Sequence, residues 1–165
     1  MTTLDYDHDG WPDVYVAVDS QASLLYRNKH DGTFAETALE SGVAPSEDGR
    51  QQAGMGTVVA DYDGDGWPDL VKTSFIDDLP NLYRNNGDGS FSETTSQAGL
   101  GKYLQFLGWG AAFVDYDNDG WPDVFMVNGH VYPGLKGASI TSDVSCIAMA
   151  ASGSLLTFRQ RQARR

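Results

Sequence analysis

The sequence predicts an all-β fold, a partial β-propeller with about two and a half four-stranded antiparallel blades. Three observations lead to this prediction. An acidic nine-residue segment occurs three times, at intervals near 55 residues, which is typical of architectures built from one repeated supersecondary unit. Glycine accounts for 19 of the 165 residues, and aromatic and β-branched residues are plentiful, as in turn-rich β-proteins. Helical periodicity is absent from the repeated segments.

The acidic segment occupies residues 5–13, 61–69 and 115–123, so its copies begin 56 and then 54 residues apart. The copies are DYDHDGWPD, DYDGDGWPD and DYDNDGWPD, and only the fourth position varies. A second segment, Leu-Tyr-Arg-Asn followed by Asp-Gly-x-Phe, occupies residues 25–34 and returns 57 residues later at 82–91. The repeat unit is therefore longer than the acidic segment alone.

The middle repeat contains the whole unit. A strand at 56–60 leads into the acidic segment and a strand at 70–75 leaves it. A hairpin turn at 86–89 then joins the strands expected at 81–85 and 90–95. Four short antiparallel strands in a unit of this length match one propeller blade.

The outer repeats are expected to be incomplete. The first has lost most of its leading strand, and the third has strands expected at 109–114 and 124–127 but no Leu-Tyr-Arg-Asn segment. The repeat region as a whole covers residues 1–133. Its three units lie near residues 1–43, 54–100 and 108–133.

The composition changes after residue 133. Residues 1–133 carry 22 acidic and 6 basic side chains, whereas residues 134–165 carry 1 acidic and 5 basic side chains and show no trace of the repeat. We expect residues 134–165 to be a divergent, disordered tail. We hypothesise that it is the frame-shifted or readthrough end of a truncated gene.

The acidic segments carry the chemistry of a calcium loop. Aspartates at positions 1, 3, 5 and 9 place four carboxylates on one short turn, and the glycine at position 6 permits that turn. Calcium accepts 6–8 oxygen ligands in a flexible shell. The sequence thus predicts up to three Ca²⁺ ions, each bound by four aspartates and by the backbone carbonyl of the tryptophan at position 7. The expected ligands are Asp5, Asp7, Asp9, Trp11 and Asp13; Asp61, Asp63, Asp65, Trp67 and Asp69; and Asp115, Asp117, Asp119, Trp121 and Asp123.

Alternatives to a calcium loop fit less well. An EF-hand needs a glutamate at position 12, where this chain has Val16, Lys72 and Met126. A simple Asp-Gly turn needs only one carboxylate. Two like charges about 4 Å apart repel by roughly 4 kcal/mol at an effective dielectric constant near 20, so four together favour a bound cation. Magnesium is less suited, because it prefers octahedral geometry and keeps its water.

Composition limits the remaining functions. The net charge of −12 disfavours nucleic acid as a partner. No apolar run is long enough to span a membrane, and residues 1–5 lack the features of a signal peptide, so the compartment is not given by the sequence. Cys146 is the single cysteine, which excludes an internal disulfide. Cys146 and His130 have no third group to orient them as a nucleophile and base, and no enzyme activity is expected.

The repeated aromatic and basic residues have structural interpretations. We expect Tyr26 with Tyr83, and Phe34 with Phe91, to pack in blade cores rather than to form a ligand platform. The three loop tryptophans are expected to pack between blades rather than to stack on a sugar. Arg27 and Arg84 are expected to pair with nearby acidic side chains.

The motifs together resemble the FG-GAP/VCBS repeats, whose D-x-D-x-D-G-x-x-D loops occur in integrin α-subunit propellers. The DYD-x-DGWPD loops, the Leu-Tyr-Arg-Asn segments and NGHVYP at 128–133 are more similar still to repeat proteins of the ASPIC/UnbV and cartilage acidic types. The resemblance covers residues 1–133 and implies a seven- or eight-bladed propeller with calcium in its loops. Such proteins are usually exported and act in adhesion or binding. This chain departs from the family in its number of blades and in lacking an export signal and an ASPIC segment.

The expected function is thus a non-enzymatic, calcium-binding propeller module for adhesion, for protein or carbohydrate interaction, or for scaffolding. Two alternatives stay open: the non-catalytic part of a larger exported lyase or hydrolase, and a truncated fragment without independent function. Open blade edges also predict self-association.

Overall fold

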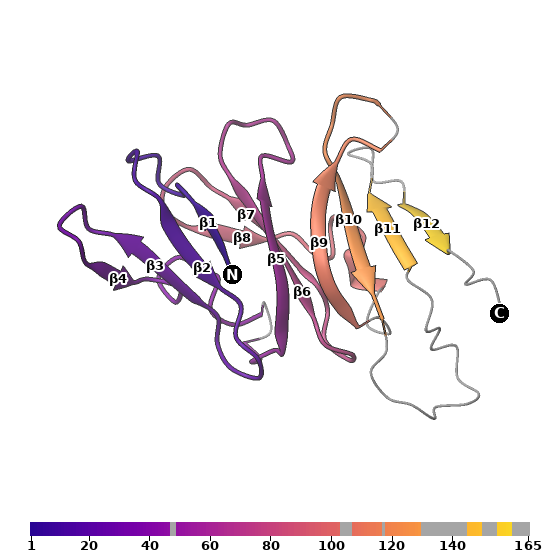
Figure 1. The fold of residues 1–165 in the computed structure, drawn as a ribbon, viewed down its shortest axis with the longest axis horizontal. Coiled ribbons are helices and arrows are strands. Elements are labelled where there is room, and N and C mark those ends of the chain that lie inside the picture. Colours follow the sequence, from indigo (N-terminus) through magenta and orange to yellow (C-terminus); the bar gives the residue numbers. More distant parts are fainter. Residues whose placement is uncertain (47–48, 103–106, 117, 130–144, 150–154, 160–165) are drawn as a thin grey trace.

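The computed structural model describes residues 1–46, 49–102, 107–116, 118–129, 145–149 and 155–159 (Figure 1). It contains two four-stranded and two two-stranded antiparallel sheets. The first sheet comprises β1 (Thr2–Leu4), β2 (Asp13–Val16), β3 (Leu24–Asn28) and β4 (Phe34–Glu36). The second comprises β5 (Gly54–Ala60), β6 (Asp69–Ser74), β7 (Asn81–Asn85) and β8 (Phe91–Glu93). The others pair β9 (Gly108–Val114) with β10 (Asp123–Asn128), and β11 (Ser145–Met149) with β12 (Leu155–Arg159).

This arrangement confirms the predicted all-β, partial propeller fold. In both four-stranded sheets each strand pairs with the next one along the chain, as in a propeller blade. Observed strand β7 coincides with the prediction of 81–85, and β5, β6, β9 and β10 differ from theirs by one or two residues at an end. The first sheet has only the three-residue β1 where the second has the seven-residue β5, as the missing leading strand predicted.

The sheets follow one another in space in the order of the sequence (Figure 1). The leading strands are adjacent, with β1 in contact with β5 and β5 in contact with β9. Two apolar cores lie between successive sheets. The first joins Tyr15 and Leu25 of the first sheet to Leu70 and Tyr83 of the second, and the next joins the second sheet to β10.

The middle sheet is buried on both faces, which explains its composition. Successive side chains of a strand point to opposite faces, and Leu70 faces the first core while Val71 faces the second. All six residues of β6 are buried, whereas β2 alternates between buried and half-buried residues. A strand covered on both sides can therefore carry apolar side chains at successive positions, as Leu70 and Val71 do, instead of an apolar–polar alternation.

The tail predicted at 134–165 lies largely outside the described residues, as does His130. The described part of the tail forms the β11–β12 hairpin, which lies beside β10 (Figure 1). Within the part of the chain that the structure describes, no helix has the length and hydropathy of a membrane span.

Strand β6 also buries a lysine. Lys72 is 2% exposed, and its ammonium donates a hydrogen bond to Gln52 Oε1 at 2.9 Å. The ammonium nitrogen of Lys72 lies 5.9 Å from the centroid of the Tyr83 ring. Burial lowers the pKa of Lys72 from 10.5 to about 8, against the opposing effects of Glu93 and Asp78. The folded state therefore holds this proton less tightly than the unfolded state does.

We expect the free energy of unfolding to rise as the pH is raised from about 8 to 10, because Lys72 loses its proton in the folded state first. The rise can reach about 3 kcal/mol, since one pKa unit corresponds to about 1.4 kcal/mol. Above pH 10 the raised pKa values of Tyr15 and Tyr83, which are due to their burial, act in the opposite direction.

Denaturant unfolding of Lys72→Met at several pH values is the measurement that checks this expectation. The variant should lose the rise, while Lys29→Met, which changes an exposed lysine, should retain it. An undiminished rise in Lys72→Met would show that another group causes it.

Candidate metal centre

Each acidic loop connects the first strand of its sheet to the second. The carboxylate at position 1 organises the loop by accepting two backbone N–H groups. In the middle loop, Asp61 Oδ1 accepts from the N–H of Asp65 at 3.1 Å and Asp61 Oδ2 from that of Gly66 at 2.9 Å. Asp5 and Asp115 accept the equivalent pairs in the other loops. The described residues of the three loops thus share these backbone hydrogen bonds.

Among the described loop residues, positions 4 and 6 have a positive φ angle. The glycine at position 6 has φ between 85° and 91° in the three copies, which explains why glycine stands there. At the variable fourth position φ is 55° for His8, 74° for Gly64 and 59° for Asn118. Glycine, asparagine and histidine are among the residues that tolerate this conformation best.

The aspartate at position 9 is the first residue of the second strand, and its carboxylate is buried. Asp69 is fully buried; its Oδ2 accepts the N–H of Tyr62 at 3.0 Å and its Oδ1 the N–H of Asn85 at 2.8 Å. Asp13 accepts the N–H groups of Tyr6 and Asn28 in the same way. The aspartate at position 9 therefore links the acidic loop to the Leu-Tyr-Arg-Asn strand of the same sheet.

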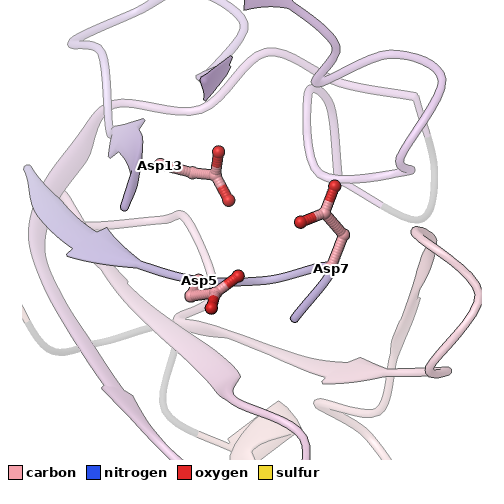
Figure 2. Close-up of side chains that lie close together, drawn as sticks. All are labelled: Asp5, Asp7 and Asp13. Carbon is pink, nitrogen blue, oxygen red and sulfur yellow. The ribbon is translucent and has the colours of Figure 1, made fainter. Parts of the chain in front are cut away.

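In each of the first two loops, three of the expected ligands come together. Carboxylate oxygens of Asp5, Asp7 and Asp13 all lie within 4.8 Å of one another and face a common space (Figure 2). In the second loop the group that meets the same limit is Asp61, Asp63 and Asp65. Asp9 and Asp69 fall outside these groups. In the third loop Asp117 lies outside the described residues, so its set of carboxylates is not described.

Arginines from the neighbouring strand approach the first two loops, as the sequence predicted. Arg27 Nε donates to Asp7 Oδ2 at 2.6 Å, and Arg84 donates to Asp63 and, at 2.8 Å, to Asp65. In the first loop Asp9 is instead paired chiefly with His30, at 2.7 Å. The repeat pattern does not predict a role for His30 here, because its counterpart in the middle repeat is Gly87.

These contacts, together with burial, shift the pKa values of loop carboxylates. Burial raises the pKa of Asp69 to about 6, although the N–H groups of Asn85 and Tyr62 act to lower it. Burial likewise raises the pKa of Asp13. For Asp9, desolvation acts to raise the pKa, but hydrogen bonds from the backbone of Trp11 and from His30 outweigh it and lower the pKa.

The residues present fit a bound calcium ion. Two oxygens on one Ca²⁺ lie at most about 5 Å apart, because each Ca–O distance is 2.3–2.6 Å. In each of the two groups, one carboxylate oxygen from each of the three aspartates lies within 4.8 Å of the other two, which satisfies this limit. Four aspartates and one arginine leave each of these loops with a net charge of −3 (−4 + 1), so the arginines do not neutralise the loops.

The loop tryptophans pack between repeats, as expected, in two of three cases. The ring of Trp67 stacks on His8 of the first loop, with 4.1 Å between centroids and 12° between planes. Trp121 lies against Gly64, where a Cβ atom would come within 2.8 Å of its ring. Trp11 instead stacks on His30 of its own repeat. The role of the three tryptophan carbonyls as ligands stays a prediction.

The repeats of this chain match a known family of repeats. The FG-GAP-like repeat model matches residues 5–72 and 75–126, which together contain all three acidic loops. No curated protein matches the chain at a significant level.

Proposed function

Because the chain belongs to the FG-GAP-like repeat family, we propose that it is a non-enzymatic, calcium-binding β-propeller module for interaction with other molecules. The coarse part of this function, a propeller-type repeat module, follows from the family and the fold. Calcium binding and the role in adhesion, protein or carbohydrate interaction, or scaffolding are the parts that we propose.

One observation carries the proposal of calcium binding. Two loops at the same place in successive sheets each bring three aspartate carboxylates within 4.8 Å of one another. The loops retain a net charge of −3 after their arginine is counted. Carboxylate oxygens are ligands of the kind that Ca²⁺ prefers.

The chain's own residues would hold the ion at the junction of two strands. In the first loop, Asp5 and Asp7 precede the turn and Asp13 begins β2, so one set of ligands spans the turn between β1 and β2. The backbone N–H groups that Asp5 and Asp13 accept keep these carboxylates oriented. A bound Ca²⁺ would supply the positive charge that offsets the repulsion between them.

The same geometry favours a structural role for the carboxylates over a catalytic one. Each aspartate at position 1 or 9 accepts backbone hydrogen bonds, and the pattern is nearly identical in three loops. Paired carboxylates that act as acid and base need environments that set their pKa values apart within one site. Three equivalent loops along one chain are more consistent with stabilised turns.

We further propose that the protein acts outside the cytoplasm, where millimolar calcium suits weak sites.

Equilibrium dialysis against Ca²⁺ tests the proposal. We expect up to three ions per chain, with dissociation constants on the order of 10⁻⁴–10⁻³ M as in extracellular modules. Asp63→Asn should remove one ion, because the amide loses a charged ligand but keeps an oxygen for the N–H of Asp65. Asp88→Asn, in an exposed turn of the same repeat, should bind as many ions as the unaltered protein. Equal stoichiometry in Asp63→Asn would contradict the assignment of the middle loop.

A further inference from the structure

The first and second repeats meet through a specific set of contacts. Phe91 of the second repeat packs on Tyr6 of the first, with 6.0 Å between ring centroids. The side-chain amide of Asn85 donates to the carbonyl of Tyr6 at 2.9 Å, a contact between residues 79 positions apart. Trp67 stacks on His8. The rear face of the second repeat, formed by Trp67, Asn85 and Phe91, thus covers positions 2 and 4 of the preceding loop.

The tryptophan part of this arrangement recurs between the second and third repeats. Trp121 covers Gly64, the fourth position of the middle loop, as Trp67 covers His8. Below the loops, Val124 and Met126 of β10 pack in one buried core with Val71 and Leu82. The contact between successive repeats is therefore a repeated feature of the chain.

The first repeat carries the same rear face, but there it is exposed. Trp11 is 47% exposed and Phe34 is 49% exposed, whereas Phe91, the counterpart of Phe34, is 7% exposed. Tyr26 is half-buried, whereas its counterpart Tyr83 is fully buried. Among the described residues, the side-chain amide of Asn28 makes contacts only within its own repeat, donating to the carbonyl of Pro12 at 3.2 Å and accepting from the N–H of His30 at 3.0 Å.

The third repeat presents the surface that this face would cover. Tyr116 and Asn118 correspond to Tyr6 and His8, and Tyr116 is 48% exposed whereas Tyr6 is 4% exposed. Asn118 is also exposed and keeps the positive φ of the fourth position. One chain therefore carries both halves of a contact that it already forms internally between its first and second repeats.

We propose that the first repeat of one copy binds the third repeat of a second copy, head to tail. Trp11 then lies over Asn118 and Phe34 over Tyr116, as Trp67 and Phe91 lie over the first repeat. Because the two surfaces differ, the interface is heterologous and continues to further copies or closes into a ring. The net charge of −12 opposes association at long range, so added salt strengthens it.

Sedimentation velocity of the full chain over a range of protein concentrations tests this interface, in chelator and with low and high NaCl. The weight-average sedimentation coefficient should rise with concentration, and more steeply in high salt. Trp11→Ala/Phe34→Ala should weaken association by at least roughly ten-fold, because buried aromatic side chains dominate such interfaces. Both side chains are exposed, so melting temperature should change little.

Two further variants separate this contact from others. Leu39→Ser alters an exposed apolar residue of the first repeat whose counterpart, Ser96, is not one of the three rear-face residues of the second repeat, and it should associate normally. Asn118→Asp keeps the backbone conformation but places a carboxylate against the negative face of the Trp11 ring, and should weaken association several-fold. A protein that stays monomeric from about 1 µM to about 1 mM overturns the proposal. Association that is unchanged by the double variant or by Asn118→Asp overturns it as well.

Discussion

Asp69→Ala is expected to lower the free energy of unfolding by about 3 kcal/mol, even when calcium is removed. The carboxylate of Asp69 is fully buried and accepts the backbone N–H groups of Tyr62 and Asn85. Alanine leaves both donors without this acceptor, and each buried unsatisfied group costs about 1–3 kcal/mol. For a chain of this size the melting temperature should fall by roughly 6–12 °C. Denaturant and thermal unfolding in chelator measure the effect.

Asp65→Ala is the matched control in the same loop. Its carboxylate accepts the N–H of Trp67 and pairs with Arg84 at the surface, where such contacts contribute less than about 1 kcal/mol. In chelator it should therefore be nearly as stable as the unaltered protein. If both variants lose the same stability in chelator, the buried hydrogen bonds of Asp69 are not the cause.

Calcium is expected to raise the stability of the folded chain substantially. At 10 mM Ca²⁺ and dissociation constants of about 10⁻⁴–10⁻³ M, mass action contributes about 1.4–2.7 kcal/mol per site. Three sites give roughly 4–8 kcal/mol, or at least about 10 °C in melting temperature. Thermal unfolding in 10 mM CaCl₂ and in excess chelator provides the comparison.

An equal ionic strength of NaCl is the control for this comparison, because general screening also relieves repulsion among the acidic side chains. Asp63→Asn should show a smaller increase with calcium than the unaltered protein, since one loop is impaired. A melting temperature that responds equally to NaCl and CaCl₂ would contradict specific sites.

Much of the fold was predictable because the repeats are local signals. The strands on both sides of the middle loop follow from apolar residues between turn residues, and β7 was predicted at its observed bounds. The carboxylates of Asp5 and Asp61 organise their loops through residues only four and five positions away. Such short-range patterns can be recognised without knowing how the sheets pack.

The sequence could not reveal contacts that depend on packing between distant segments. Phe34 and Phe91 occupy equivalent positions, and both were predicted to lie in a core. Only Phe91 has a neighbouring repeat on its face, so Phe34 remains half exposed. The contact of Asn85 with Tyr6 likewise joins separate sheets.

The composition of each carboxylate group also depends on tertiary contacts. Asp9 is held by His30, 21 residues away, and the group in its loop includes Asp13 instead. In the middle loop Gly87 replaces His30, and Asp65 stays with Asp61 and Asp63. Identical aspartate spacing therefore does not give identical geometry.

A crystal structure grown in excess calcium, with anomalous difference maps, tests the central claim most directly. We predict one anomalous peak within each acidic loop, at about 2.3–2.6 Å from the aspartate oxygens and the carbonyl of the loop tryptophan. Well-ordered loops without such peaks, with their carboxylates turned toward solvent, would contradict it.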